Sequence, residues 1–346
     1  MRAGSIKLFR LFGITIYLHW TWFLVFLLGI GAGYYTTVFW GLLTIFALFT
    51  VVLMHEYGHA LACRSVGGQA DTIILWPLGG FAIVSPPWRP GAMLWSVAAG
   101  PLVNVFLIPI TLGIWLFILN HLGVASGHTI LQLLINPPLG ELGDPPRFVY
   151  AICFLNFAIL IFNLLPIYPL DGGKMLWSIL WFFIGDAWAL RIASAIGLAG
   201  SGTLAAYVAI QILADLQTSL QAQASWLHAV ERAFNQNVYR IALCGFLIFE
   251  AFSAFQESGR QIALSKLPRH EHCGCAHCGR RALAGPLSVC ANCSTHFDMF
   301  ASHGQCPNCH ASFMNTEIRC PECRAVSPVS HWFAAATVDP IEQPKS

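Results

Sequence analysis

Residues 11–59 set the architecture of the chain, and they read LFGITIYLHWTWFLVFLLGIGAGYYTTVFWGLLTIFALFTVVLMHEYGH. No Asp, Glu, Lys or Arg occurs from Leu11 to His55, so Glu56 is the first such residue in this stretch. A helix crosses the hydrocarbon core of a bilayer in about 20 apolar residues, and this run is long enough to do so. Placing a charged side chain at membrane depth costs on the order of 3 kcal/mol, and such residues usually carry a function. We therefore expect a membrane helix that ends in a functional glutamate.

The composition of the whole chain supports a membrane protein. Of its 346 residues, 56% are hydrophobic and 10% are charged, and the mean hydropathy is +0.64. A typical soluble domain carries about 25% charged residues, so a large soluble globule is excluded. Two further stretches, 90–140 and 148–170, contain no Asp, Glu, Lys or Arg. The formal net charge of +2 does not indicate a nucleic-acid-binding protein.

We expect an all-α polytopic membrane protein with about six membrane-spanning helices and a short β-hairpin at the membrane face. The hairpin is expected at 70–85, because this stretch is rich in Ile and is interrupted by Pro77, Gly79 and Gly80. The stretch 238–255 is either a seventh span or a helix that lies on the membrane. The expected spans are 14–31, 38–63, 92–120, 148–165, 174–184 and 192–212.

The basic residues predict how these spans are oriented. Arg2, Lys7 and Arg10 precede the first apolar run, which is longer than the hydrophobic region of a signal peptide, so we expect it to be retained. The positive-inside rule then places the N-terminus in the cytoplasm. Arg64 follows the second expected span and Lys174 the fourth, so both span ends lie on the cytoplasmic side.

The residues His55-Glu56-Tyr57-Gly58-His59 combine two metal ligands with a possible base. Positions four apart lie on one face of a helix, so His55 and His59 point the same way. Two imidazoles suit Zn²⁺, and Glu56 can act as a general base on a zinc-activated water. The alternative is a glutamate that reaches the membrane interface beside two packed histidines.

Asp171 suits the third ligand that a catalytic zinc requires. It is the first acidic residue after the uncharged run 148–170, and it lies at the same membrane face as His55. Pro166 and Pro169 interrupt the helix before it, and an irregular segment at membrane depth is tolerated where it lines a cavity. The alternative role of Asp171 is to cap the following helix.

These two motifs together resemble the site-2 protease family of intramembrane zinc metalloproteases. The resemblance rests on H-E-Y-G-H at 55–59 and N-L-L-P-I-Y-P-L-D-G-G at 163–173, and it extends over roughly residues 10–255. It implies that His55, His59 and Asp171 bind the catalytic zinc and that Glu56 is the general base.

The resemblance implies further site residues. Asn163 matches an active-site asparagine whose amide could stabilise the oxyanion, although a hydrogen bond between helices is the alternative. Asn104, in Gly-Pro-Leu-Val-Asn at 100–104, matches a position that could hold the substrate backbone, with helix packing as the alternative. The segment 75–81 resembles the membrane-face strand of the family, which could bind an extended peptide along its edge. The expected substrate-binding residues are Gly79, Gly80, Phe81, Ala82, Ile83 and Val84.

The C-terminal region is rich in cysteine. Four Cys-x-x-Cys pairs, with inner spacings of 11 and 10 residues, indicate two consecutive zinc ribbons closed by thiolates. Interleaved pairing, Cys273 in place of Cys275, and disulfides in an oxidising compartment remain alternatives. A histidine could also replace a thiolate, and the candidates are His277, His296, His303 and His310. The expected ligands are Cys275, Cys278, Cys290, Cys293, Cys306, Cys309, Cys320 and Cys323.

The expected organisation is a transmembrane metalloprotease domain at 1–257, a linker at 258–272, a double zinc-ribbon module at 273–332 and a disordered tail at 333–346. The favoured function is an intramembrane zinc endopeptidase that cuts transmembrane segments of other membrane proteins, as in regulated intramembrane proteolysis. It would hold one catalytic and two structural Zn²⁺ ions. The zinc-ribbon tail is expected in the cytoplasm with a protein partner, because its charges balance and give no footprint for nucleic acid.

The rival is a non-proteolytic membrane scaffold or zinc-binding adaptor on the same fold. A metal transporter is a third interpretation, but it requires several membrane-embedded ligands along a path. His19 is the other early candidate for such a ligand, and it lies beside Trp20 at an expected interface.

Overall fold

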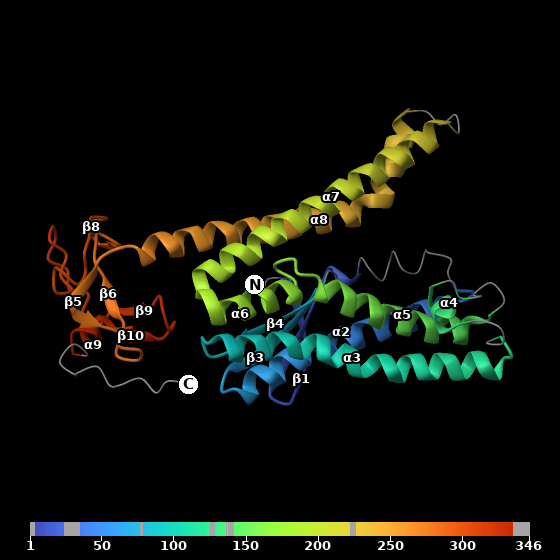
Figure 1. The fold of residues 1–346 in the computed structure, drawn as a ribbon, viewed down its shortest axis with the longest axis horizontal. Coiled ribbons are helices and arrows are strands. Elements are labelled where there is room, and N and C mark those ends of the chain that lie inside the picture. Colours follow the sequence, from blue (N-terminus) through green and yellow to red (C-terminus); the bar gives the residue numbers. More distant parts are fainter. Residues whose placement is uncertain are drawn as a thin grey trace. The chain divides into compact units, whose positions relative to one another are not determined.

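The computed structural model describes residues 4–23, 35–76, 79–124, 129–135, 137, 142–221 and 226–334. The chain divides into two compact units, Met1–Gln256 and Glu257–Ser346. The first unit, called the membrane unit below, consists mainly of helices (Figure 1). The second, called the ribbon unit, consists mainly of short strands and loops and holds the four cysteine pairs.

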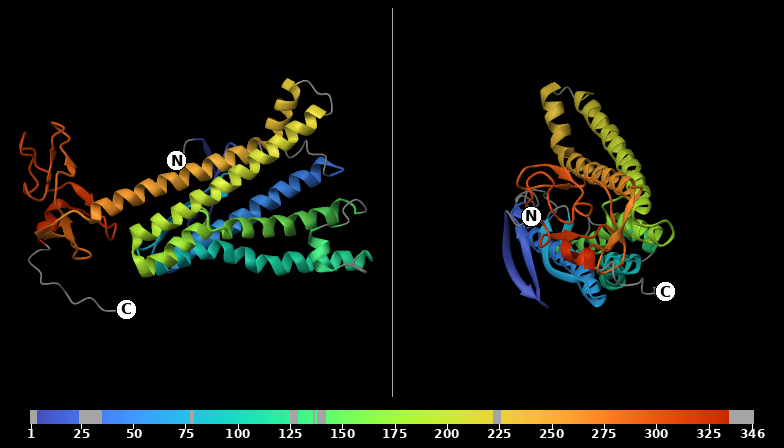
Figure 2. Two further views of the ribbon diagram at one scale, coloured as in Figure 1. Left: turned by 45° about the horizontal axis from the view of Figure 1, so that its top comes forward. Right: turned by 90° about the vertical axis from the view of Figure 1, so that its left-hand side faces the viewer.

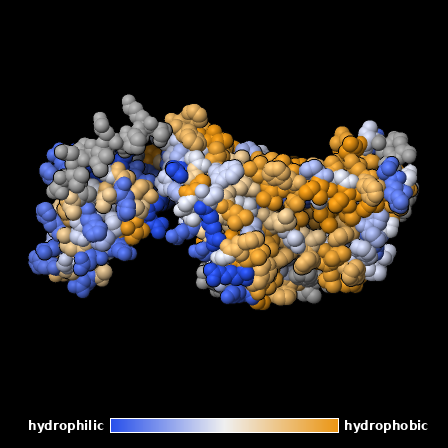
Figure 3. All heavy atoms as spheres, turned by 90° about the horizontal axis from the view of Figure 1, so that it is seen from below, coloured by the Kyte–Doolittle hydropathy of each residue, from blue (hydrophilic) through white to orange (hydrophobic). Residues whose placement is uncertain are grey.

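Five helices in the described part of the chain are long and apolar enough to cross a membrane. Large apolar side chains face outward on them, such as Phe106, which is 72% exposed, and Phe117, which is 71% exposed. Figure 3 shows hydrophobic residues gathered over a broad area of this unit. Such a surface suits lipid, so the protein is an integral membrane protein. The five helices are α2 (Val38–Ser65), α3 (Pro90–His121), α5 (Asp144–Leu164), α7 (Asp186–Gln221) and α8 (Trp226–Ser265).

Helix α6 (Asp171–Ile184) corrects one expected span. The prediction of a span at 174–184 is wrong, because α6 has 14 residues. Such a helix is about 21 Å long, which is less than the hydrocarbon thickness of about 30 Å. Helix α4 (Ile130–Ile135) is shorter still.

Helices α7 and α8 lie side by side over much of their length (Figures 1 and 2). Polar pairs join them: Asn237 donates a hydrogen bond to Asp215 at 2.9 Å, and Arg191 donates one to the carbonyl oxygen of Phe255 at 2.9 Å. Such pairing allows polar side chains to remain within a membrane bundle. The stretch 238–255, for which two interpretations were open, therefore belongs to one long helix that includes the candidate span Arg240–Ser265.

The N-terminal segment differs from the prediction. A first span at 14–31 is wrong over residues 14–19, because these residues form strand β2 (Ile14–His19), paired antiparallel with β1 (Ser5–Leu11). Ile14 and Ile16 are fully buried while their neighbours are not, which is the alternation of a strand. Residues 24–31 of the expected span lie outside the described part.

A four-stranded sheet in the order β1-β2-β3-β4 packs on α2. Strand β3 (Gln69–Trp76) runs parallel to β2, and β4 (Gly79–Ser85) pairs antiparallel with β3, which confirms the predicted hairpin. Ile16, Ile73 and Leu75 of the sheet join Ala60 and Cys63 of α2 in one buried cluster. The sheet is thereby held against the end of the helix that carries the histidines, with β4 as its edge strand.

After the end of α8, the described part of the ribbon unit contains three two-stranded antiparallel ribbons and one short helix, α9 (Val329–Ala334). Helix α8 continues to Ser265, so residues 258–265 of the expected linker are helical. Residues 333 and 334 of the expected tail belong to α9, and the rest of that tail lies outside the described part. The ribbons pair β5 (Arg269–Gly274) with β6 (Arg281–Leu283), β7 (Ser288–Val289) with β8 (His296–Phe297), and β9 (Glu317–Arg319) with β10 (Val326–Pro328).

Candidate metal centre

The last turns of α2 carry three polar side chains that are almost completely buried. His55, Glu56 and His59 are 3%, 6% and 7% exposed. The Nε2 atoms of the two histidines lie 3.1 Å apart, as expected for positions four apart on one helix. Buried groups of this kind need partners, and those partners come from three other elements of the membrane unit.

Asp171 approaches the histidines from the start of α6. Helix α5 ends at Leu164, and the chain turns through 166–170 before α6 begins at Asp171. The turn is tight, because a Cβ atom on Gly172 would lie 2.4 Å from the Leu164 carbonyl oxygen. The Oδ2 atom of Asp171 lies 3.0 Å from Nε2 of His55 and 3.1 Å from Nε2 of His59.

These three side chains fit a zinc ion. Two imidazole nitrogens and one carboxylate oxygen are a common donor set of catalytic zinc, which keeps a fourth position open. Ligand distances of about 2.0 Å give a tetrahedron with edges of about 3.3 Å, close to the separations of 3.0–3.1 Å seen here. The structure therefore brings together His55, His59 and Asp171, the three ligands predicted from the sequence.

Hydrogen bonds on the far side of each ring orient the two histidines. Nδ1 of His55 donates to the side-chain oxygen of Asn104 at 2.6 Å, and Nδ1 of His59 donates to the carbonyl oxygen of Ser96 at 2.9 Å. Both partners of these bonds are acceptors, so each Nδ1 carries the proton and each Nε2 keeps its lone pair for a metal. Helix α3 supplies both acceptors.

Asn104 has a different position from the one we expected. It is fully buried, its oxygen is bonded to His55, and its Nδ2 donates to Oδ1 of Asn156 at 2.6 Å. The side-chain oxygen and nitrogen of Asn104 are thus both bonded to other side chains of the protein. We therefore revise its expected role from contact with the substrate to orientation of His55. Asn156, on α5, was missed by the sequence analysis, although it is the one asparagine within the uncharged residues 148–161.

Glu56 faces the edge of the sheet. Its Oε2 atom accepts a hydrogen bond from the backbone N–H of Ala82 in β4 at 2.9 Å. The backbone of Ala82, one of the six predicted strand residues, therefore meets the expected base. Asn163 lies half-buried in the last turns of α5, and among the described residues it makes no hydrogen bond to the side chains of the centre.

The ribbon unit contains two further candidate metal sites, and their pairing corrects the prediction. Consecutive ribbons are wrong: the first cysteine pair meets the fourth, and the second meets the third. Sγ–Sγ distances are 3.7 and 3.8 Å in one cluster and 3.5 Å for both contacts in the other. A tetrahedral zinc with sulfur at about 2.3 Å has edges of about 3.8 Å. The clusters are Cys275, Cys278, Cys320 and Cys323, and Cys290, Cys293, Cys306 and Cys309.

Each cysteine pair forms the same backbone turn. In the first, the N–H of Cys275 donates to the Arg280 carbonyl and the N–H of Gly279 donates to the Cys275 carbonyl, and this pattern recurs at the other three. The residue after each second cysteine has a positive φ, from 55° to 68°. Neither Cys273 nor any of the four candidate histidines belongs to the clusters found among the described residues.

Hydrogen bonding favours the thiolate at one cysteine of the second cluster. Hydrogen bonds with the Thr295 side chain and backbone lower the pKa of Cys293 to about 6. Burial raises the pKa of Cys290 to about 11. A divalent cation would favour the ionised form of all four cysteines.

A buried His-His-Asp centre beside a glutamate, held among membrane helices, is the arrangement of a membrane zinc metallopeptidase. Comparison with known proteins agrees. Residues 43–207, which include all four of these side chains, match the model of Peptidase family M50. Over these residues the chain is therefore similar to the members of peptidase family M50.

Similar proteins come from several microorganisms. The chain is 34% identical over 194 residues to zinc metalloprotease MJ0392 of Methanocaldococcus jannaschii. The aligned region covers 56% of this chain and 50% of that protein. It is 31% identical over 221 residues to the putative zinc metalloprotease sll0528 of Synechocystis sp. That aligned region covers 58% of this chain and 51% of that protein. The chain thus spans about half the length of these relatives. The solved site-2 protease from Methanocaldococcus jannaschii is 26% identical, with a TM-score of 0.43, over 72% of this chain and 95% of that one.

Proposed function

We propose that this protein is an intramembrane zinc endopeptidase that cleaves transmembrane segments of other membrane proteins. The observation that carries the proposal is the convergence of Nε2 of His55, Nε2 of His59 and Oδ2 of Asp171 within the membrane unit. Similarity to peptidase family M50 and to known zinc metalloproteases supports zinc as the metal and peptide bonds as the substrate. These three side chains would hold one catalytic zinc ion.

The residues around the centre divide the work of hydrolysis. When bound, zinc would supply Lewis acidity that makes a water molecule nucleophilic near neutral pH and polarises the peptide carbonyl. Glu56 takes the proton from the water and passes it to the leaving amine. Asn104 and the Ser96 carbonyl fix the orientation of the two imidazole rings. The amide of Asn163 would donate a hydrogen bond to the developing oxyanion.

Strand β4 would hold the substrate. It is an edge strand, and the N–H of Ala82 reaches the carboxylate of Glu56. An extended peptide that pairs with this edge would have its backbone beside the base. A transmembrane substrate must therefore unwind locally, because a helix keeps its amide groups bonded internally. The segment Gly79–Val84 is the proposed binding edge.

We also propose that the ribbon unit holds two structural zinc ions and, with the N-terminus, lies in the cytoplasm. A zinc site closed by four thiolates leaves no open position for catalysis. The positive-inside rule supports a cytoplasmic N-terminus through Arg2, Lys7 and Arg10.

The test compares wild type with Glu56→Gln on a single-span model substrate in reconstituted bilayers. We expect cleavage by wild type and a loss of about 100-fold or more in the variant, at equal zinc content. Glu257→Gln, which makes the same chemical change on an exposed side chain of α8, is the matched control and should cleave normally. Full activity of Glu56→Gln would refute the mechanism. Absence of cleavage by a zinc-loaded, folded wild type on any membrane substrate tried would favour the scaffold.

A further inference from the structure

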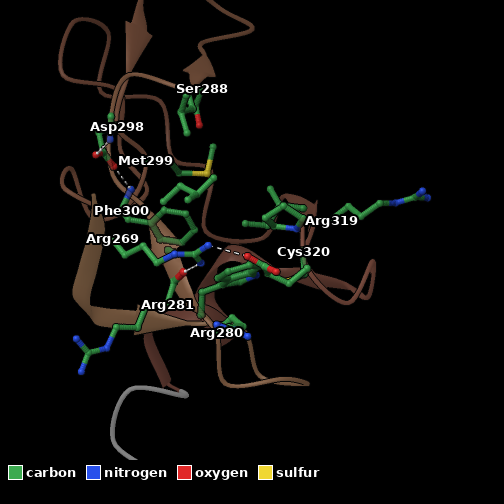
Figure 4. Close-up of a pocket in the computed structure, with 17 residues that line it drawn as sticks. Arg269, Arg280, Arg281, Ser288, Asp298, Met299, Phe300, Arg319 and Cys320 are labelled. Carbon is green, nitrogen blue, oxygen red and sulfur yellow. Dashed lines mark hydrogen bonds and ion pairs between the residues drawn. The ribbon is translucent and has the colours of Figure 1, made fainter. Parts of the chain in front are cut away.

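The ribbon unit contains a cavity of ≈130 Å³ (Figure 4). Its apolar wall includes Met299, Phe300, Ile318 and Trp332, which come from a loop, strand β9 and helix α9. Leu287, which is 49% exposed, extends this wall to the surface. An apolar cavity of about 150 Å³ in another protein binds one benzene molecule, so this space suits one apolar side chain rather than a helix.

Four arginines surround this cavity, and three of them have no ion-pair partner among the described residues. Arg269 forms an ion pair with Glu322 at 2.6 Å. The remaining three, Arg280, Arg281 and Arg319, are exposed, and none forms an ion pair with a carboxylate in the described part of the chain. Figure 4 shows Arg281 and Arg319 on opposite sides of the cavity.

The two acidic side chains that line the cavity, Glu322 and Asp298, already have partners within the protein. Asp298 accepts hydrogen bonds from His270 at 2.9 Å and from the backbone N–H of Gly285 at 2.6 Å. Burial acts to raise the pKa of Asp298, but these and two further backbone hydrogen bonds outweigh it and leave the pKa below its usual value. Asp298 therefore stays ionised in its own network, and the rim keeps an excess of positive charge.

Trp332 contributes an aromatic face to the cavity wall. Its side chain lines the cavity and the residue is 3% exposed. Its indole N–H is enclosed and has no hydrogen-bond partner among the described residues, so the ring offers the cavity an apolar surface.

We propose that this cavity binds an acidic peptide segment of a partner protein. One apolar side chain of the peptide fills the space beside Phe300, and neighbouring carboxylates pair with the arginines. Arginine forms paired hydrogen bonds with carboxylates, so the rim selects acidic residues next to the apolar one. A nucleic acid is disfavoured, since the unit from Glu257 to Ser346 has nearly balanced numbers of basic and acidic residues.

The experiment measures fluorescence anisotropy of labelled peptides with the zinc-loaded full chain in detergent micelles. The probes are a dodecapeptide of Asp-Leu-Glu repeats, its counterpart with lysine at every acidic position, and a 20-nucleotide single-stranded DNA. We expect saturable binding of the acidic peptide alone. Arg319→Glu should weaken it about tenfold or more, because a charge-assisted hydrogen bond is lost and a repulsion is added.

Two further variants separate the cavity from the rest of the unit. Arg260→Glu reverses an exposed arginine on α8 outside the cavity and should leave the affinity unchanged. Leu287→Ala removes the exposed part of the apolar wall and should weaken binding severalfold at unchanged zinc content. Equal binding of the lysine peptide or preferential binding of the DNA would overturn the proposal. Binding of the acidic peptide by Arg319→Glu with wild-type affinity would also overturn it. So would binding that requires removal of residues 335–346, because the cavity would then be the site of that segment of the chain.

Discussion

Replacing Gly100 of α3 with alanine should disrupt the metal centre. A Cβ atom at this position would lie 2.2 Å from Nε2 of His59 and 2.8 Å from Nε2 of His55. Ordinary contacts begin at 3.4 Å, so the His59 ring would have to withdraw from 2.2 Å to at least that distance. A misplacement of about 1 Å costs roughly 100-fold in an enzyme, and we expect zinc affinity and cleavage to fall by about that factor.

The substitution is informative because it should otherwise favour the helix. Alanine stabilises a helix interior by about 0.5–1 kcal/mol relative to glycine, so a loss of zinc cannot come from weaker helix formation. Gly113→Ala on the same helix is the matched control, because nothing lies within 4 Å of its added Cβ atom. Chelator competition measures zinc affinity, and the reconstituted substrate measures cleavage. Zinc affinity of Gly100→Ala within about threefold of wild type would refute the proposed position of the metal, since the expected loss is roughly 100-fold.

Three other substitutions test separate parts of the structure. Asn156→Leu removes the acceptor that holds the histidine-orienting asparagine, and zinc affinity measured by chelator competition should fall about 10- to 100-fold; an unchanged affinity would contradict the relay. Ala82→Pro removes the N–H that meets the proposed base and blocks strand pairing, so cleavage should be lost while zinc is retained, whereas Ala82→Val keeps the N–H and should remain active. The double variant Cys275→Ser, Cys323→Ser should lose one zinc ion, because both cysteines belong to one cluster, whereas the double variant Cys275→Ser, Cys290→Ser should lose two. Native mass spectrometry counts the ions. The reverse result would support consecutive ribbons.

Much of the membrane unit could be predicted because charged residues are so rare in it. Glu56 and Asp171 each end an uncharged run, and a carboxylate in that position is costly unless it has a function. The spacing of His55 and His59 is a local property of one helix, so both rings were expected on one face. The convergence of His55, His59 and Asp171 follows from these local signals together with the side of the membrane on which each span ends.

The N-terminal segment shows the limit of counting charges. An uncharged run such as 14–19 fits a membrane helix or a buried strand equally well, because both exclude charged residues. Ile16 pairs with Ile73, which lies far along the chain, and such a partner is visible only in the folded structure. The buried pair of Asn104 and Asn156 is similar, because it joins two helices whose register the sequence leaves open.

The sequence by itself predicted the expected ligands: two histidines and one aspartate in the membrane unit, and eight cysteines in four Cys-x-x-Cys pairs, with Cys273 and four histidines left as alternatives. It could do so because the spacing within each pair and along one helix is a local property. Only the tertiary structure decided which turns share a metal site. Cys275 meets Cys323 across 48 positions, and the four turns have the same backbone hydrogen bonds. Identical local structure cannot select a partner, so the selection depends on how the strands between the turns pack.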